Sequence, residues 1–83
     1  MPRFYFHVCN GAGFVQDEEG RDLPDLEAAR AEAIRGARSI MASDVQRGTL
    51  DLSSFIEIED AEKRLVLTVG FEDAVDLTKR HDG

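Results

Sequence analysis

The first residues of the chain alternate between two sides. Within residues 3–9, Phe4 and Phe6 share one side and Tyr5 lies on the other, which is the two-residue period of a β-strand. Asn10-Gly11 follows directly and is typical of a two-residue type I′ turn, because both central residues of that turn need positive φ. The pattern therefore predicts a β-hairpin at the start of the chain.

The turn sets the register of this hairpin. With Asn10-Gly11 at its centre, residues 12–16 return as the second strand, and His7 lies opposite Phe14. Because directly opposite residues share a face, Phe14 joins Tyr5 and His7 on one side of the sheet. A loop longer by one residue would reverse the faces of the second strand.

The middle of the chain has the period of an amphipathic α-helix. Asp25 is a suitable N-cap, the helical pattern runs from Leu26 to Arg47, and Gly48 suits the stop after it. Small and apolar residues recur three, four or one positions apart and form a single stripe. The stripe consists of Leu26, Ala29, Ala33, Ala37, Ile40 and Met41. Its alanines would let the helix axis approach a sheet closely.

A second hairpin is predicted after the helix. Residues 55–69 contain two alternating segments on either side of the polar loop 60–63. A four-residue loop would place Ile58 opposite Leu65, so that both lie on one apolar face.

These elements predict an α+β domain of order ββαββ, in which one amphipathic helix packs on one face of a four-stranded antiparallel sheet. With 83 residues there is room for a single domain, which we place at residues 1–77. Residues 71–77 are expected to add a short helical turn or an edge strand at one end of the core. The polar residues 78–83 are expected to form a disordered C-terminal tail.

The charge of the chain disfavours polyanionic partners. The formal net charge is −7, and affinity for nucleic acids rests mainly on Lys and Arg that neutralise phosphates. Direct binding to nucleic acid or to an anionic membrane is therefore not expected. The lone Cys9 cannot form an internal disulfide, and the opening lacks the apolar core of a signal peptide, so a cytoplasmic location is expected.

Residue types that carry catalysis or bind metals are sparse. Cys9 and His7 lie two apart on one strand, about 7 Å from each other, which is too far for a direct hydrogen bond. Structural zinc takes about four Cys or His ligands, and the chain has three such residues. The acidic segment 17–22 lacks the ligand spacing of a calcium loop, and Glu59 is expected to pair with Arg64 across the second hairpin. We therefore expect no enzyme, no catalytic residue, no metal site and no cofactor.

The sheet face away from the helix is the feature that points most clearly to a function. One helix covers one side of the predicted sheet, so aromatic and apolar side chains remain on the other, and contiguous patches of this kind mark interfaces. The candidate interface consists of Tyr5, His7, Phe14, Phe55, Val66 and Thr68.

Two classes of function fit this face. The leading hypothesis is a non-enzymatic cytoplasmic protein-interaction module that binds another protein or itself, as a homodimer, through the open face or an edge strand. The alternative is a nucleic-acid-directed regulator, or an acidic mimic of nucleic acid that binds a basic partner. Exposed aromatic residues motivate the regulator, and the negative charge motivates the mimic. A monomer whose second face is merely amphipathic also stays open.

The opening block Pro2-Arg3-Phe4-Tyr5-Phe6-His7-Val8 is the most distinctive sequence feature. Further matches to one pattern are Asp17, Gly20, Leu23-Pro24-Asp25-Leu26, the alanine-rich helix, Leu67-Thr68-Val69, Phe71 and Asp73-Ala74-Val75. Over residues 2–77 the chain resembles a family of small α-proteobacterial proteins of unknown function, common in rhizobia. Cys9 and Gly70 depart from the family pattern. The resemblance implies bacterial origin and intracellular placement, and it implies no activity, cofactor or site residue.

Overall fold

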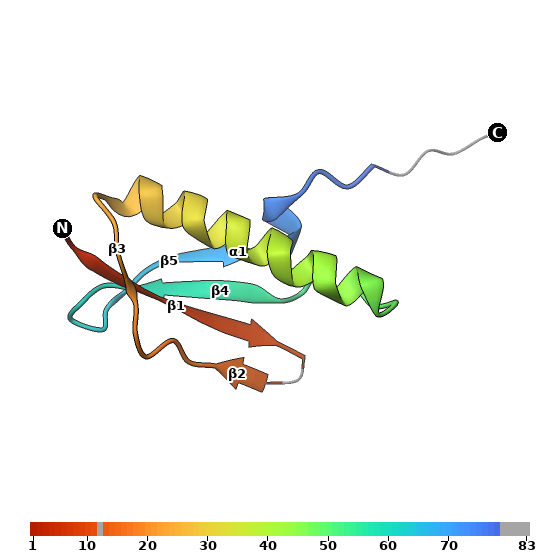
Figure 1. The fold of residues 1–83 in the computed structure, drawn as a ribbon, viewed down its shortest axis with the longest axis horizontal. Helices are drawn as coiled ribbons and strands as arrows, with labels where there is room; N and C mark the ends of the chain where they lie inside the picture. Colours follow the sequence, from red (N-terminus) through yellow and green to blue (C-terminus); the bar gives the residue numbers. More distant parts are fainter. Residues whose placement is uncertain (12, 79–83) are drawn as a thin grey trace.

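The computed structural model describes residues 1–11 and 13–78 of the chain (Figure 1). Five strands, one long helix and one short helix follow each other along the sequence. They are β1 (Arg3–Asn10), β2 (Gly13–Val15), β3 (Arg21–Asp22), α1 (Leu26–Gln46), β4 (Phe55–Glu59), β5 (Leu65–Gly70) and the 3₁₀ helix η1 (Phe71–Ala74). The predicted α+β class, with one long helix beside an antiparallel sheet, is confirmed.

The two hairpins lie side by side, with β1 and β4 at the centre of the sheet. The strand order is β2-β1-β4-β5, and β1 and β4 pair antiparallel from Tyr5 opposite Glu59 to Cys9 opposite Phe55. This arrangement makes residues that are about fifty positions apart in the sequence direct neighbours on one sheet face.

The predicted count of four strands is wrong, because β3 adds a fifth. β3 pairs with the N-terminal half of β1 and contains only two polar residues, so it has no alternation that a sequence pattern could reveal. It is held instead by contacts at its edge. The Arg3 guanidinium bonds the Asp22 carboxylate at 2.9 Å, and the Leu23 N–H donates to the Pro2 carbonyl at 3.0 Å.

The predicted register of the first hairpin is wrong by two positions. Cys9, not His7, lies opposite Phe14, and Asn10 is the last paired residue of β1 rather than part of the turn. The Asp51 carboxylate accepts a hydrogen bond from the backbone of Gly11, so a residue far along the chain positions the hairpin tip. A shift by two leaves the faces unchanged, so Phe14 still shares the face of His7.

The predicted register of the second hairpin is wrong in the same way. Ile58 lies opposite Leu67, and the register shifts again between Ile58 and the next residue of β4. The cause lies in the loop, where the Asp60 carboxylate accepts hydrogen bonds from the N–H groups of Glu62 and Arg64. These bonds keep Arg64 in the loop and delay the start of β5.

Helix α1 begins and ends close to where the sequence predicts. The Asp25 carboxylate accepts from the Ala28 N–H at 2.8 Å, and Gly48, with φ of +88°, follows the last turn. Leu26, which the stripe included, is 40% exposed. The buried residues of α1 are Ala29, Ala33, Ala37 and Met41.

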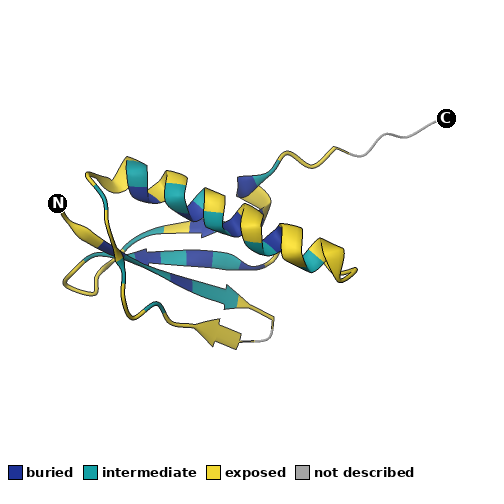
Figure 2. Cartoon of the chain, in the orientation of Figure 1, coloured by how far each residue is buried: buried dark blue, intermediate teal, exposed yellow. Residues whose placement is uncertain are grey.

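The core lies between α1 and one face of the sheet (Figure 2). Besides the helix residues, it contains Phe4, Ile56, Ile58, Val69, Phe71 and Ala74. An α-helix is about 10 Å wide and strands lie about 4.8 Å apart, so one helix covers about two strands. Since α1 packs on β4, β5 and η1, Phe6 and Val8 of β1 are only partly buried.

Residues after β5 form the short helical turn that the sequence predicts as one of two options. Arg38 of α1 holds this turn, because its Nε donates to the Ala74 carbonyl at 2.6 Å. Thr78 is exposed, and the remaining residues of the predicted tail, 79–83, lie outside the described residues. Among the described residues, no helix has both the length and the apolar character needed to cross a membrane.

Candidate functional site

The sheet face away from α1 carries a polar network rather than a continuous apolar surface. The pairing of β1 with β4 places Tyr5, His7 and Cys9 next to the carboxylates of Glu57 and Glu59 on this face. We call it the open face, because α1 covers only the opposite side of the sheet (Figure 1).

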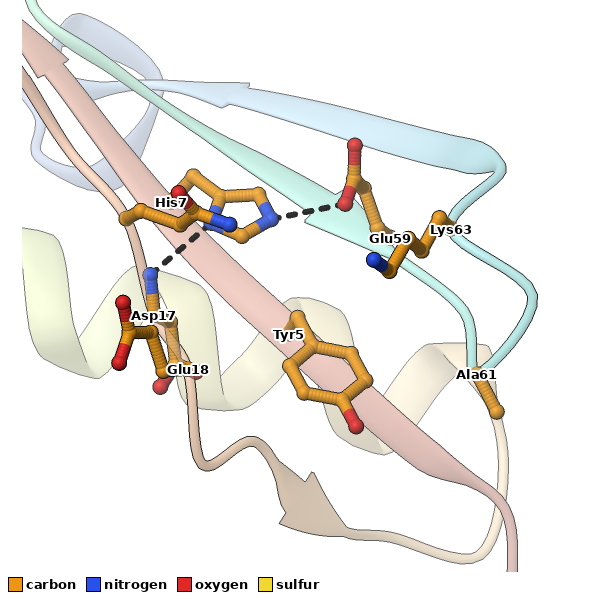
Figure 3. Close-up of a pocket in the computed structure, with 8 residues that line it drawn as sticks. Tyr5, His7, Asp17, Glu18, Glu59, Ala61 and Lys63 are labelled. Carbon is orange, nitrogen blue, oxygen red and sulfur yellow. Dashed lines mark hydrogen bonds and ion pairs between the residues drawn. The ribbon is translucent and has the colours of Figure 1, made fainter.

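His7 is the centre of the network. Its residue is only 4% exposed, although it lies on the side of the sheet without a helix. The Nε2 atom lies 2.8 Å from Glu59 Oε1, and the Nδ1 atom accepts the Asp17 N–H at 3.0 Å (Figure 3). The Phe14 ring also covers it, with 5.5 Å between ring centroids. Both ring nitrogens of this buried histidine are therefore satisfied.

These two bonds fix the protonation state of the ring. A backbone N–H is a donor only, so the Nδ1 atom that accepts from Asp17 carries no proton. Nε2 then carries the proton of the neutral imidazole and donates it to Glu59. His7 is thus neutral in the Nε2–H form.

Asp17 connects the segment between β2 and β3 to the outer edge of β1 by hydrogen bonds. It lies between β2 and β3, and its carboxylate accepts hydrogen bonds from the backbone N–H groups of Phe6, Glu19 and Gly20. Burial raises the pKa of this carboxyl, but the three N–H groups and the nearby His7 together outweigh burial and lower the pKa below its usual value. Gly20 has φ of +71°, and a Cβ there would lie 2.9 Å from the Phe4 carbonyl oxygen, so the turn requires glycine.

A pocket of about 310 Å³ opens beside this network (Figure 3). Its floor comes from β1, one wall comes from the segment between β2 and β3, and the other wall comes from the end of β4 and the loop after it. The lining residues are Tyr5, His7, Gln16, Asp17, Glu18, Glu59, Ala61 and Lys63.

Cys9 does not provide an activated thiol. Its Sγ lies 3.5 Å from Glu57 Oε1, to which it donates. Burial raises the pKa of the Cys9 thiol, and the hydrogen bond and the negative charge of Glu57 raise it further. A thiol with a raised pKa stays protonated, and the protonated form is a poor nucleophile.

The other residues of the predicted interface lie in different environments. Phe14 is 56% exposed, Thr68 is exposed, and Tyr5 and Phe55 are partly buried. Val66 is partly buried and packs against the core. Phe14 packs against the His7 ring from its place opposite Cys9, and Tyr5 lies nearer the other end of β1.

The predicted ion pair between Glu59 and Arg64 is wrong. The Arg64 guanidinium bonds the carboxylates of Asp60 and Glu62 instead, because Arg64 stays in the loop. This leaves Glu59 to accept the hydrogen bond from His7.

Five polar residues that line the pocket were not part of the predicted interface, namely Gln16, Asp17, Glu18, Glu59 and Lys63. The alternation of β1 and β4 places His7 and Glu59 on matching faces, but only knowledge that these strands are neighbours would pair them. The acidic segment 17–22, examined as a calcium site, positions a loop through Asp17 instead. Within the described part of the chain, no group of three or more His, Cys, Asp or Glu residues could hold a metal ion.

Comparison with known proteins gives a family but no activity. The sequence model of a domain of unknown function, DUF6894, matches residues 3–72. Searches of curated proteins and of solved structures found no match to the chain. The predicted membership of a family of unknown function is confirmed, and because the match covers most of its length, the chain belongs to the DUF6894 family.

Proposed function

We propose that this protein is a non-enzymatic protein-interaction module that associates with a second copy of itself through the outer edge of β5. Among the described residues, β5 is the last strand of the sheet path and pairs only with β4. Its six residues, Leu-Val-Leu-Thr-Val-Gly, include no charge and no proline. Edge strands of monomeric proteins commonly carry charged residues or proline, which prevent pairing with another chain. This uncharged edge is the observation that carries the proposal.

The opposite side of the sheet is built differently. Two short strands, β2 and β3, occupy the outer edge of β1, and the Asp17 carboxylate takes the Phe6 N–H between them. The outer edge of β1 is therefore interrupted and partly occupied, which favours β5 as the edge that pairs.

Backbone geometry identifies the groups that would pair. The Phe71 N–H donates to the Ser54 carbonyl, and hydrogen bonding alternates along an antiparallel pair. Val69 and Leu67 therefore direct their backbone groups toward β4, whereas Thr68 and Gly70 direct theirs outward. Two copies of β5 in antiparallel orientation would join around a two-fold axis and extend both sheets.

The test is the mass in solution, measured by light scattering. The wild-type protein should have a mass near twice 9.2 kDa. Thr68→Pro removes an outward N–H without removing a bond to β4, so it should give the monomer mass. Thr68→Ser, the matched control, should keep the dimer. A wild-type mass of one chain at every concentration would refute self-association.

Amide hydrogen exchange provides a second measurement. In the dimer the Thr68 N–H should exchange slowly, and dilution or Thr68→Pro should accelerate exchange at Gly70. If the protein has the mass of a dimer but the Thr68 N–H exchanges quickly, the interface does not lie at β5.

A further inference from the structure

The pocket beside His7 combines a negative field with an aromatic wall. Three carboxylates and one ammonium group line it, and His7 is neutral, so the lining carries two net negative charges at pH 7. Isolated anions are therefore disfavoured, and an organic cation is favoured.

The carboxylates that line the pocket differ in how free their oxygens are to accept a hydrogen bond from a ligand. Both Asp17 oxygens accept backbone N–H groups, so this residue contributes charge but few free lone pairs. Glu59 uses Oε1 for His7, and its side chain, which lines the pocket, is 31% exposed. Glu18, which is exposed at the rim, adds a second carboxylate.

Tyr5 selects among cations. Its partly buried ring lies between the segment that holds Glu18 and the loop that holds Ala61 and Lys63 (Figure 3). A cation over an aromatic ring gains from the ring quadrupole, and a guanidinium group is planar, weakly hydrated and able to bond a carboxylate while it stacks. An ammonium group is more strongly hydrated and cannot stack in this way.

We propose that this pocket binds a guanidinium group, which stacks on Tyr5 and donates to the Glu59 carboxylate. His7 holds Glu59 through Oε1 and so fixes the position of the carboxylate at the pocket. This proposal does not depend on association through β5, because no residue of β5 lines the pocket. The guanidinium can belong to an arginine side chain of a polypeptide or to free arginine.

The test is an NMR titration with N-acetyl-arginine-N-methylamide, a blocked arginine. Amide signals of Tyr5 and Glu59 and the ring signals of His7 should shift and saturate. The same derivative of citrulline, which has the shape of arginine without its charge, should cause no saturable shift. Absence of saturation with the arginine probe, or equal binding of the citrulline probe, would overturn the proposal.

Two matched variants locate the site. Glu59→Gln keeps an oxygen that accepts from His7 but removes the charge, and it should weaken binding at least about tenfold, because a hydrogen bond to a charged group exceeds the ~1.4 kcal/mol that a factor of ten represents. Glu57→Gln changes the same residue type on the same strand and face outside the pocket lining, and it should leave binding unchanged. Equal weakening by both variants would refute the assigned site.

Lys63 distinguishes the two sources of the guanidinium. Free arginine carries a carboxylate that Lys63 would attract, whereas the blocked probe does not. If free arginine binds more tightly than the blocked probe, and Lys63→Gln abolishes this difference, the pocket is assigned to the free amino acid. Equal or tighter binding of the blocked probe assigns it to an arginine of a polypeptide. Either result supports guanidinium recognition, and Tyr5→Leu should weaken both probes.

Discussion

The two faces of this sheet are stabilised by different means. On the covered face, apolar side chains such as Ile58 are buried beneath a helix whose contact residues are mostly alanines. On the open face, the most buried side chain is a histidine, and its partners are a backbone N–H and a carboxylate. The covered face is stabilised by the removal of apolar area from water, and the open face is stabilised by satisfied hydrogen bonds.

This difference separates stability from function. A face stabilised by apolar packing tolerates little change in volume and presents little chemistry. A face stabilised by hydrogen bonds keeps charged and polar groups in fixed positions, which is what recognition of a ligand needs. The candidate site therefore lies on the face without the helix.

The largest expected effect is on the covered face. Ile58 is fully buried in the core, so Ile58→Ala should lower the free energy of unfolding by about 2–5 kcal/mol, the range for such truncations. Leu65→Ala is the control, since Leu65 is 55% exposed and should change stability by no more than about 0.5 kcal/mol. Urea denaturation measures both, and equal losses would show that the core is misplaced.

A smaller loss is expected when the open face loses its histidine. His7→Phe keeps an aromatic ring but leaves the Asp17 N–H and the Glu59 carboxylate without their partner, at a cost of about 2 kcal/mol. His7→Gln, whose amide can donate and accept, should recover part of the loss. Chemical denaturation measures these changes, and a Phe variant as stable as wild type would show that the network is not stabilising.

The third effect depends on pH. Asp17→Asn should lower the free energy of unfolding by about 1–2 kcal/mol at pH 7. The reason is that the amide NH₂ group would take the place of one carboxylate oxygen and would face a backbone N–H group that it cannot accept. The folded protein lowers the pKa of Asp17, so its carboxylate contributes fully above its unfolded pKa of about 3.9 and loses this contribution as pH falls through the folded pKa.

The stability difference between wild type and Asp17→Asn should therefore be constant from neutral pH to about pH 5 and shrink below about pH 4. Glu18→Gln is the control on the exposed neighbouring residue. A difference that instead grows as pH falls would contradict the assigned role of Asp17.

The smallest expected effect concerns the helix that makes the two faces unequal. Asp25→Ala removes the cap that accepts the Ala28 N–H and should cost about 1 kcal/mol. Asp25→Ser should cost less, because serine also caps helices well. Thermal unfolding followed by circular dichroism measures both, and no difference between them would argue against capping by the side chain.

Local signals in the sequence were enough to predict part of the fold. The period of β1, the stripe of α1 and the cap at Asp25 each depend on residues close together in the chain. The structure confirms β1 and the cap, and it confirms the stripe except at Leu26, which is exposed, and Ile40, which is only partly buried. Alternation also assigned Phe14 to the face of His7 although the register was wrong, because a shift by two residues conserves the face.

Contacts between distant segments were beyond the sequence patterns. The hairpin tip is positioned by Asp51, and β3 is held by Arg3, so neither feature follows from its own residues. The candidate site has the same character. His7 meets Glu59 because β1 lies beside β4, and it meets Asp17 because the chain leaves the sheet between β2 and β3.

The protonation state of the His7 ring is the most direct test of the hydrogen-bond network on the open face. Two-dimensional NMR correlation of the ring nitrogens with the ring protons distinguishes the two neutral forms from each other and from the charged imidazolium. At pH 7 the ring should be neutral, with the proton on Nε2 and none on Nδ1. A proton on Nδ1, in either the other neutral form or the imidazolium, would contradict the bond from Asp17 and the organisation of the open face.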